Sequence, residues 1–128
     1  MSVLDLVLLP DDYAVCRLDR GSAVPAIEPG RDGVVSVTRS ADEISVICPA
    51  DLAPPAAATN TPWRCLQVAG PVDFALTGIL ASLVNPLADA RVNIFAFSTY
   101  ETDYILVPTV RLAEALTALS GAGHRIAT

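Results

Sequence analysis

The residues best suited to chemistry form a short loop, Gly70-Pro71-Val72-Asp73, directly before an apolar run that begins at Phe74. Gly70 permits a sharp bend where a strand ends, and Pro71 stiffens that bend. If Phe74 begins a helix, the unpaired N–H groups of its first turn carry partial positive charge and attract a carboxylate. Asp73 has two interpretations: it caps this helix, or its carboxylate accepts hydrogen bonds from an ammonium group.

A second group of polar residues, Ser98, Thr99 and Asp103, surrounds a predicted turn between two strands. Such residues ordinarily satisfy the backbone groups of their own turn, but Asp103 is also a second candidate acceptor for an ammonium group. Gly78 interrupts the apolar helical pattern, at a cost of about 1 kcal/mol relative to alanine in a helix interior. Either close helix packing or the close approach of a ligand would explain that glycine.

The sequence contains none of the GxSxG, HExxH, Walker or GxGxxG motifs that mark hydrolases, zinc proteases and nucleotide-binding proteins. The three cysteines, Cys16, Cys48 and Cys65, are widely spaced and form no CxxC pair, so we expect reduced core residues rather than metal ligands. His124, the single histidine, follows a Gly-Ala-Gly turn, and we expect it to be a solvated residue at the end of a strand. We therefore predict no catalytic residue, no metal site and no cofactor.

The composition excludes several classes of protein. Apolar residues make up 52% of the chain, which excludes a disordered protein. Eight arginines and no lysine stand against 14 acidic residues, and the resulting net charge of −6 disfavours binding to nucleic acid. The N-terminus lacks the basic stretch of a signal peptide, and the apolar runs fall short of the roughly 20 residues that cross a bilayer. We expect a cytoplasmic protein that contacts neither nucleic acid nor membrane.

The elements that must position these residues follow a regular order in the second half of the chain. The patterns predict a strand, a helix beginning at Phe74, two strands joined by a turn, a helix capped by Thr109 and a short final strand. Pro86 should end or kink the first helix near Asn85. The predicted strands are 63–69, 92–97, 103–107 and 124–127. This βαββαβ order is typical of the ferredoxin-like fold.

The first half of the chain is rich in strand and turn signals, with an irregular loop of glycine and proline at 20–33. The last two of its strands form a predicted hairpin. The predicted strands are 4–9, 13–18, 34–38 and 43–48. A connector at 49–62 holds the boundary between two predicted domains, residues 1–60 and 61–128. We therefore predict an α+β protein whose antiparallel sheets are covered by helices on one face.

The loop 70–81, the run ARVNIFAFSTY at 90–100 and the strand DYILV at 103–107 together resemble an ACT domain. The chain is similar to the tandem-ACT group, which includes small bacterial proteins, aspartate kinase regulatory regions and arginine sensors of the CASTOR type. Segments 13–18 and 36–48 resemble the degenerate N-terminal ACT-like subdomain of that group. The resemblance implies two ACT-like halves and a sensor, usually dimeric, that binds an amino acid at an interface between ACT units. It implies ligand contacts at Gly70, Pro71, Val72, Asp73, Phe74, Gly78, Ser98, Thr99 and Asp103.

The leading hypothesis is a non-enzymatic regulatory protein that binds an amino acid. Because the sequence has no attached catalytic or DNA-binding domain, such a sensor would report to a separate, unidentified protein. In the segment from Val92 to Phe97, apolar residues occur at both the odd and the even positions, which face opposite sides of a strand. This pattern predicts that both faces of the sheet are covered and that the chain forms a homodimer. Two alternatives stay open: a structural or protein-interaction module that keeps the fold without a ligand, and a small enzyme of unknown type.

Overall fold

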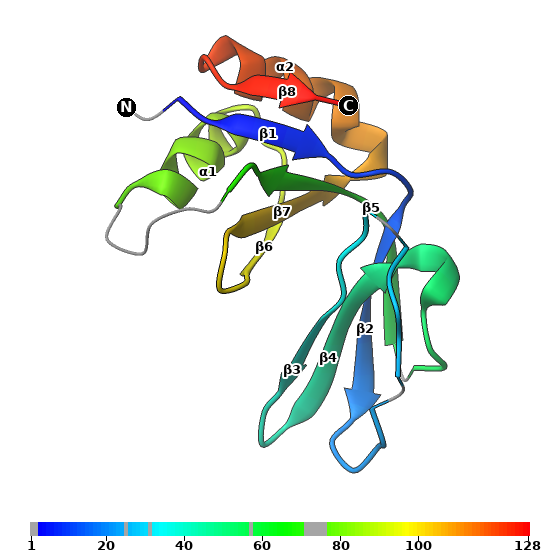
Figure 1. Ribbon diagram of the computed structural model, residues 1–128. Helices are drawn as coiled ribbons and strands as arrows, with labels where there is room; N and C mark the ends of the chain where they lie inside the picture. Colours follow the sequence, from blue (N-terminus) through cyan, green and yellow to red (C-terminus); the bar gives the residue numbers. More distant parts are fainter. Residues whose placement is uncertain (1–2, 25, 31, 57, 71–76) are drawn as a thin grey trace. The chain divides into compact units, whose positions relative to one another are not determined.

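The computed structural model describes residues 3–24, 26–30, 32–56, 58–70 and 77–128 (Figure 1). Contacts within the chain divide it into two compact units. The N-terminal unit is Pro10–Trp63, and the C-terminal unit combines Met1–Leu9 with Arg64–Thr128. The start of the chain, which the sequence-based division grouped with the first domain, thus contributes to the C-terminal unit.

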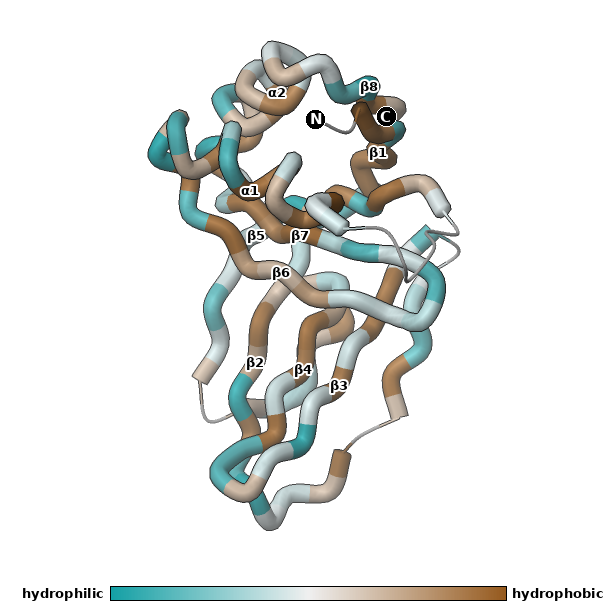
Figure 2. The backbone as a smooth tube through the Cα atoms, turned by 90° about the vertical axis from the view of Figure 1, so that its left-hand side faces the viewer, coloured by the Kyte–Doolittle hydropathy of each residue, from teal (hydrophilic) through white to brown (hydrophobic). Residues whose placement is uncertain are grey.

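The N-terminal unit is built from antiparallel strands. Its elements are β2 (Tyr13–Asp19), β3 (Ser36–Arg39), β4 (Glu43–Pro49), the 3-10 turn η1 (Ala50–Leu52) and the first part of β5 (Ala58–Val68). β4 pairs with both β3 and β2, and β2 pairs with β5, so the predicted hairpin is confirmed. Figure 2 shows hydrophobic residues along β2 and β4. The buried core of these strands is Ala14, Cys16, Leu18, Ile44, Val46 and Cys48.

The turn between β3 and β4 is closed by its own residues. The N–H group of Ser40 donates to the Glu43 carbonyl at 2.9 Å. Ser40 Oγ accepts hydrogen bonds from the N–H groups of Asp42 and Glu43, each at 3.2 Å and each exposed to solvent. Serine commonly satisfies turn backbone in this way. These bonds stay within four residues of the chain.

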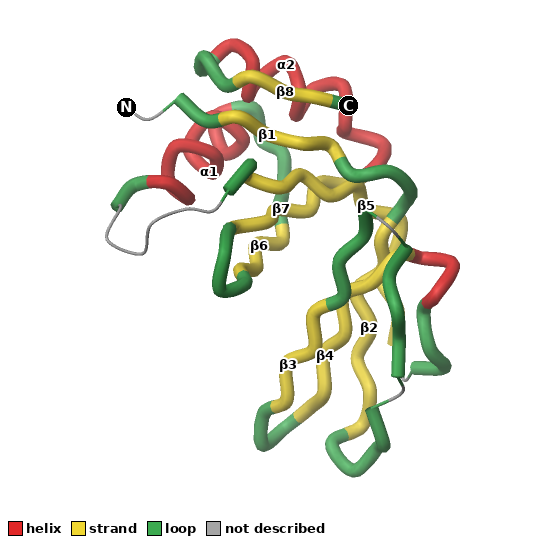
Figure 3. Tube along the Cα trace, viewed as in Figure 1, coloured by secondary structure: helices red, strands yellow, loops and turns green. Residues whose placement is uncertain are grey.

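The C-terminal unit follows the predicted strand and helix order (Figure 3). The last part of β5 is followed by α1 (Ile79–Asp89), β6 (Phe95–Ser98), β7 (Asp103–Pro108), the 3-10 turn η2 (Thr109–Arg111), α2 (Leu112–Gly121) and β8 (Arg125–Ala127). β7 lies between β5 and β6. The strand β1 (Asp5–Leu8) lies between β5, with which it is antiparallel, and β8, with which it is parallel. The N-terminal strand therefore separates two strands that come from the second half of the chain.

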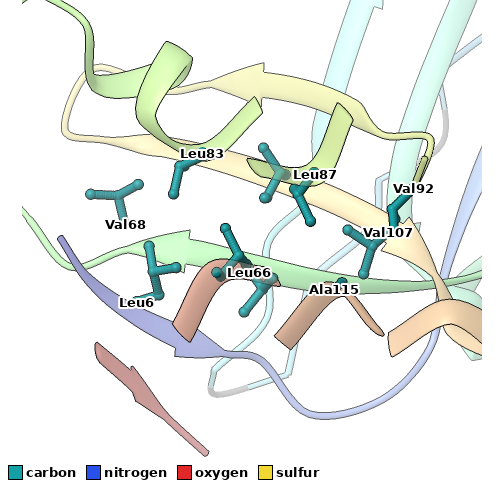
Figure 4. Packing of buried hydrophobic residues seen from close by; sticks show 10 residues of the cluster. Leu6, Leu66, Val68, Leu83, Leu87, Val92, Val107 and Ala115 are labelled. Atoms are coloured by element: carbon teal, nitrogen blue, oxygen red, sulfur yellow. The ribbon is translucent and has the colours of Figure 1, made fainter. Parts of the chain in front are cut away.

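One hydrophobic cluster joins both helices to the sheet of the C-terminal unit (Figure 4). Leu83 and Leu87 lie four residues apart on α1 and so share one face of that helix. Alternate residues of β5, such as Leu66 and Val68, face the same core because side chains of a strand alternate between its two faces. The buried members of the cluster are Leu6, Leu66, Val68, Leu83, Leu87, Val92, Ile105, Val107, Ala115 and Leu119. The α+β fold class is therefore confirmed.

The helix α1 runs through Pro86 to Asp89, so the prediction that Pro86 ends it near Asn85 is wrong. Proline has no N–H group, and it leaves the carbonyl four residues earlier, at Ser82, without its helical donor. The Nε2 atom of His124 lies 2.8 Å from that carbonyl and supplies the missing hydrogen bond. The compensation lets the helix continue for another three residues.

His124 is 4% exposed, so the prediction of a solvated strand-end residue is also wrong. Its Nδ1 atom accepts a hydrogen bond from the N–H group of Leu4 at 3.1 Å, while Nε2 faces the Ser82 carbonyl. Because Nδ1 accepts, the ring proton lies on Nε2, which donates. One imidazole thus joins the start of β1 to α1.

The helix α2 ends at Gly121, and its beginning differs from the prediction. Thr109 lies in η2 rather than at the N-cap of α2, which is Arg111. The guanidinium of Arg111 pairs with Glu114 in the first turn of α2. An acidic side chain in a first turn is favourable because the helix dipole is positive there.

Candidate functional site

The predicted site residues divide into those that the structure places and those that it does not. Gly70 lies two residues after the end of β5, Ser98 ends β6, and Asp103 begins β7. Thr99 lies in the turn between β6 and β7, and Gly78 directly precedes α1. The remaining predicted contacts, Pro71, Val72, Asp73 and Phe74, lie outside the described residues.

The start of α1 corrects two predictions. α1 begins at Ile79 and its N-cap is Gly78, so the predicted start at Phe74 with Asp73 as N-cap is wrong. Gly78 therefore stands before the helix rather than inside it. Its φ of 77° lies in the left-handed region, which glycine adopts without steric conflict from a Cβ atom. This backbone conformation is not helical.

Close packing does not explain Gly78. A Cβ added there would meet no atom of the described residues within 4 Å, whereas its positive φ gives a reason for the glycine. Gly78 offers no side-chain cap, and no acidic residue occupies the first turn of α1. The first N–H groups of this 11-residue helix therefore keep the partial positive charge expected of a helix N-terminus.

A side-chain hydrogen bond connects the turn between β6 and β7 to the end of β5. The Thr102 hydroxyl donates to the carbonyl of Val68 at 2.5 Å, and Thr102 is only 5% exposed. Inside the turn, the N–H group of Thr99 donates to the carbonyl of Thr102 at 2.9 Å. Val68 stands two residues before Gly70, so this bond places the β6–β7 turn beside the strand end that leads to Gly70.

Two of the predicted binding side chains contact each other. The Ser98 hydroxyl donates to Oδ1 of Asp103 at 2.5 Å, and the two residues are register partners on β6 and β7. The next pair in the ladder, Phe97 and Tyr104, is stacked with ring centroids 5.1 Å apart. The Asp103 carboxylate has a second oxygen with lone pairs to offer, so the pair still leaves it able to accept from an ammonium group.

Two of the three cysteines, Cys48 and Cys65, are not activated as nucleophiles. All three are free and buried. Burial raises the pKa of Cys65 to about 12, and burial together with the neighbouring Cys16 raises the pKa of Cys48 to about 11. A nucleophilic cysteine needs a lowered pKa, because the thiolate is the reactive form. Within the parts of the chain that the structure describes, no group of three or more His, Cys, Asp or Glu side chains is placed to hold a metal ion.

Sequence reasoning missed two residues that shape this unit, Thr102 and His124. Nothing in the pattern near Thr102 points to Val68, because their pairing depends on the fold. For His124 a signal did exist. Pro86 within an apolar helical pattern implies an unpaired carbonyl at Ser82, and a buried imidazole is one of the donors able to satisfy it.

Comparisons with known protein families identify the C-terminal unit. A family model described as ACT domain matches residues 58–121 of the chain, from β5 to the end of α2. The chain belongs to the ACT domain family. A second family model, described as an N-terminal domain, matches residues 11–56. The ACT match covers every described residue of the candidate site.

Solved structures resemble this ACT-domain protein along nearly its whole length. A protein from Agobacterium tumefaciens is 34% identical, with a TM-score of 0.89, and the match covers 99% of this chain and 94% of that one. A protein of unknown function from Vibrio cholerae, described as a possible transport protein, is 19% identical with a TM-score of 0.70, covering 93% and 89%. The regulatory subunit of aspartate kinase from Thermus flavus is 15% identical with a TM-score of 0.60, covering 95% and 99%. The last two matches show a shared fold.

None of the curated proteins compared with this ACT-domain chain matches it. A helix with the length and apolarity needed to cross a bilayer does not occur among the described residues.

Proposed function

We propose that the protein is a non-enzymatic regulatory protein that binds an amino acid at an interface between ACT units. The proposed contacts are the loop from Gly70 to Phe74, Gly78, and the Ser98, Thr99 and Asp103 side of the β6–β7 turn. The observation that carries the proposal is the Thr102 bond to Val68, which holds this turn beside the strand end that leads to Gly70. Membership of the ACT family supports the regulatory role.

The chemistry of the two segments suits a zwitterion. The first N–H groups of α1, which Gly78 leaves without a side-chain cap, would attract the ligand's carboxylate. The Asp103 carboxylate, and Asp73 in the loop, would accept hydrogen bonds from the ammonium group. This assignment separates the two charges of the ligand between the α1 side and the hairpin side of the site.

The proposed assembly is a homodimer. Among the described strands, β6 pairs only with β7, so its outer edge is available. The four residues of β6 carry no charge, and its Phe95 is 37% exposed. Edge strands of monomers are commonly protected by charged side chains, so an uncharged edge favours pairing with a second copy. A homodimer would supply the second ACT unit of the site.

The proposed setting is the cytoplasm, with a separate regulated protein as partner. Three free, buried cysteines are typical of a reducing compartment. One relative in fold is a regulatory subunit of aspartate kinase, which supports a role in controlling another protein.

Isothermal titration of the purified protein with each of the twenty amino acids, paired with thermal unfolding, tests the proposal. We expect heat from at least one amino acid and a raised melting temperature, since a ligand at 100 times its Kd stabilises a protein by about 2.7 kcal/mol. Absence of heat and of a melting shift with all twenty would rule the proposal out.

A matched pair of variants tests the site itself. Asp103→Asn removes the charge of the proposed acceptor but keeps an oxygen for the Ser98 hydroxyl, so we expect affinity to fall about tenfold or more. Glu101→Gln makes the same charge change at an exposed neighbour in the turn, and should leave affinity within about twofold. Equal affinity in both variants would remove Asp103 from the site.

One observation favours a second candidate, an interaction module that keeps the ACT fold without a ligand. The hydrogen bond between Ser98 and Asp103 satisfies two proposed binding groups within the protein. The same titration separates the candidates, because such a module would form the homodimer and bind no amino acid.

A further inference from the structure

We infer that Thr102 is a positioning residue for the proposed amino-acid site, because its hydroxyl sets the separation between the Gly70 end of β5 and the β6–β7 turn. The inference rests on the function proposed above. It assigns to Thr102 no contact with the ligand. Its role is to hold the β6–β7 turn, which carries the proposed acceptor of the ammonium group, beside the strand that leads into the rest of the site.

The environment of Thr102 differs from that of its neighbours in the turn. Tyr100 is 79% exposed, Glu101 is exposed, and Thr102 is 5% exposed. A threonine in a hairpin turn ordinarily bonds the backbone of that turn. The Thr102 hydroxyl instead reaches the carbonyl of Val68, 34 residues earlier in the chain. Thr99 closes the turn, because its N–H group donates a hydrogen bond to the Thr102 carbonyl.

The accepting carbonyl of Val68 belongs to the end of β5, which also pairs with β1 on its other side. Val68 is a register partner of Leu6 on β1, and its side chain is 2% exposed in the core. The next residue, Ala69, donates its N–H group to the Asp5 carbonyl at 2.8 Å. Gly70 follows at once. A change in the bond from Thr102 would therefore alter the path of the backbone only two residues before the proposed binding loop.

An amino acid makes this geometry demanding. Its carboxylate and its ammonium group are attached to the same carbon, so the protein groups that bind them must keep a fixed separation. Binding groups must lie within roughly 0.5 Å of their productive positions, and that precision comes from residues that lock the surrounding backbone. The Thr102 hydroxyl is buried, directional and bonded to the backbone, which fits such a role.

The experiment compares three substitutions in the full chain, with each of the twenty amino acids titrated singly. Thr102→Val keeps the shape of the side chain and removes the hydroxyl, whereas Thr102→Ser keeps the hydroxyl. Thr117→Val, at an exposed position of α2, makes the same chemical change away from the site. Thr102→Ala gives a second variant without the hydroxyl if Thr102→Val does not fold.

We expect Thr102→Val to bind at least about tenfold more weakly than the unaltered protein, and Thr102→Ser and Thr117→Val to stay within about twofold. Amide hydrogen exchange without any amino acid gives an independent readout. Exchange at Gly70 and Thr99 should become faster in Thr102→Val and not in Thr102→Ser.

The outcomes separate this inference from the proposed function. Binding by the unaltered protein with unchanged affinity in Thr102→Val, or no recovery in Thr102→Ser, overturns the inference and leaves the proposed function in place. Heat from none of the twenty amino acids in the unaltered protein overturns the proposed function and the binding role of Thr102 with it. Unchanged exchange at Gly70 and Thr99 in Thr102→Val shows that the hydroxyl does not hold these segments, which also overturns the inference.

Discussion

The two hairpins of this chain close their turns in different ways. In the turn between β3 and β4, Ser40 bonds Asp42 and Glu43, and these contacts are exposed and local. In the turn between β6 and β7, Thr99 closes the turn and Thr102 bonds the carbonyl of Val68 on another strand. The β3–β4 turn only reverses the direction of the chain. The β6–β7 turn is also held in position against another strand of the sheet. The proposed site lies at the β6–β7 turn.

His124 extends this comparison to a helix. Like Thr102, it donates to a backbone carbonyl far away in the sequence, here at Ser82. Replacing it with leucine leaves that carbonyl and the Leu4 N–H group without partners, and each buried orphan costs about 1–3 kcal/mol. We therefore expect His124→Leu to lower the free energy of unfolding by roughly 2–6 kcal/mol, measured by denaturant titration.

A double-mutant cycle identifies the cause of this loss. Pro86→Ala restores an N–H group that can donate to the Ser82 carbonyl along the helix. In that background His124→Leu should cost about 1–3 kcal/mol less, because only the Leu4 bond is lost. Additive effects of Pro86→Ala and His124→Leu would mean that His124 does not compensate for the proline.

The two turns should differ in their effect on stability. Thr102→Val leaves the Val68 carbonyl unsatisfied in a buried setting, so we expect a loss of about 1–3 kcal/mol in the free energy of unfolding. Ser40→Ala removes an exposed, local oxygen whose N–H partners can bond water, and should cost less than about 1 kcal/mol. Equal losses measured by denaturant unfolding would remove the distinction between the two turns.

The buried thiols give a dependence on pH in the alkaline range. Burial raises the pKa of Cys65 from its usual value of 9.0 to about 12. The stabilisation is therefore fully present below pH 9 and is lost as the pH rises towards 12, because the unfolded chain releases the proton first. We expect a slope of up to about 1.4 kcal/mol per pH unit in that window. A Cys65→Val variant should lack this contribution in denaturant titrations between pH 8 and 11, and an equal slope would contradict the prediction.

The smallest effect should come from the ion pair between β1 and β8. Arg125 Nε donates to Asp5 Oδ1 at 2.6 Å, and this bond lowers the pKa of the exposed Asp5 carboxyl. Its contribution is present above the usual pKa of about 3.8 and disappears as the pH falls through the lowered value. We expect Asp5→Asn to shift the melting temperature only slightly at pH 7, and progressively less as the pH falls below 3.8. A shift that does not decrease with falling pH would point to another cause.

Local patterns predicted much of this fold. The β3–β4 hairpin, the two helices and the β6–β7 hairpin follow from apolar periodicity and turn residues, which act within a few positions of the chain. The ACT resemblance at 70–81 and 90–107 likewise came from local motifs, and the family match confirms it.

Most of the features that the sequence did not predict depend on contacts between residues far apart in the chain, and one depends on a local backbone conformation. The start of α1 is set by the left-handed backbone of Gly78, which an apolar pattern does not reveal. The passage of α1 through Pro86 depends on His124, 42 residues beyond Ser82. The position of β1 depends on pairing with both β5 and β8. Of the candidate site, the structure places Gly70, Gly78 and the hairpin residues, and the bond from Thr102 to Val68 that links the hairpin to β5 could not be predicted from the sequence.

The position of β1 has consequences for folding during synthesis and for truncation of the chain. The segment Pro10–Trp63, which includes the first part of β5, is inserted between β1 and the last part of β5, which pair with each other in a discontinuous unit. Among the strands of this unit, β1 is synthesised before the others and its parallel neighbour β8 after them, so the pairing of the unit is incomplete until the chain has been translated through Ala127. A fragment that starts after the insertion would lack the middle strand between β5 and β8, and both strands would expose unpaired backbone in place of β1. A circularly permuted chain that joins residue 128 to residue 1 and opens within the insertion would keep all of these strands together.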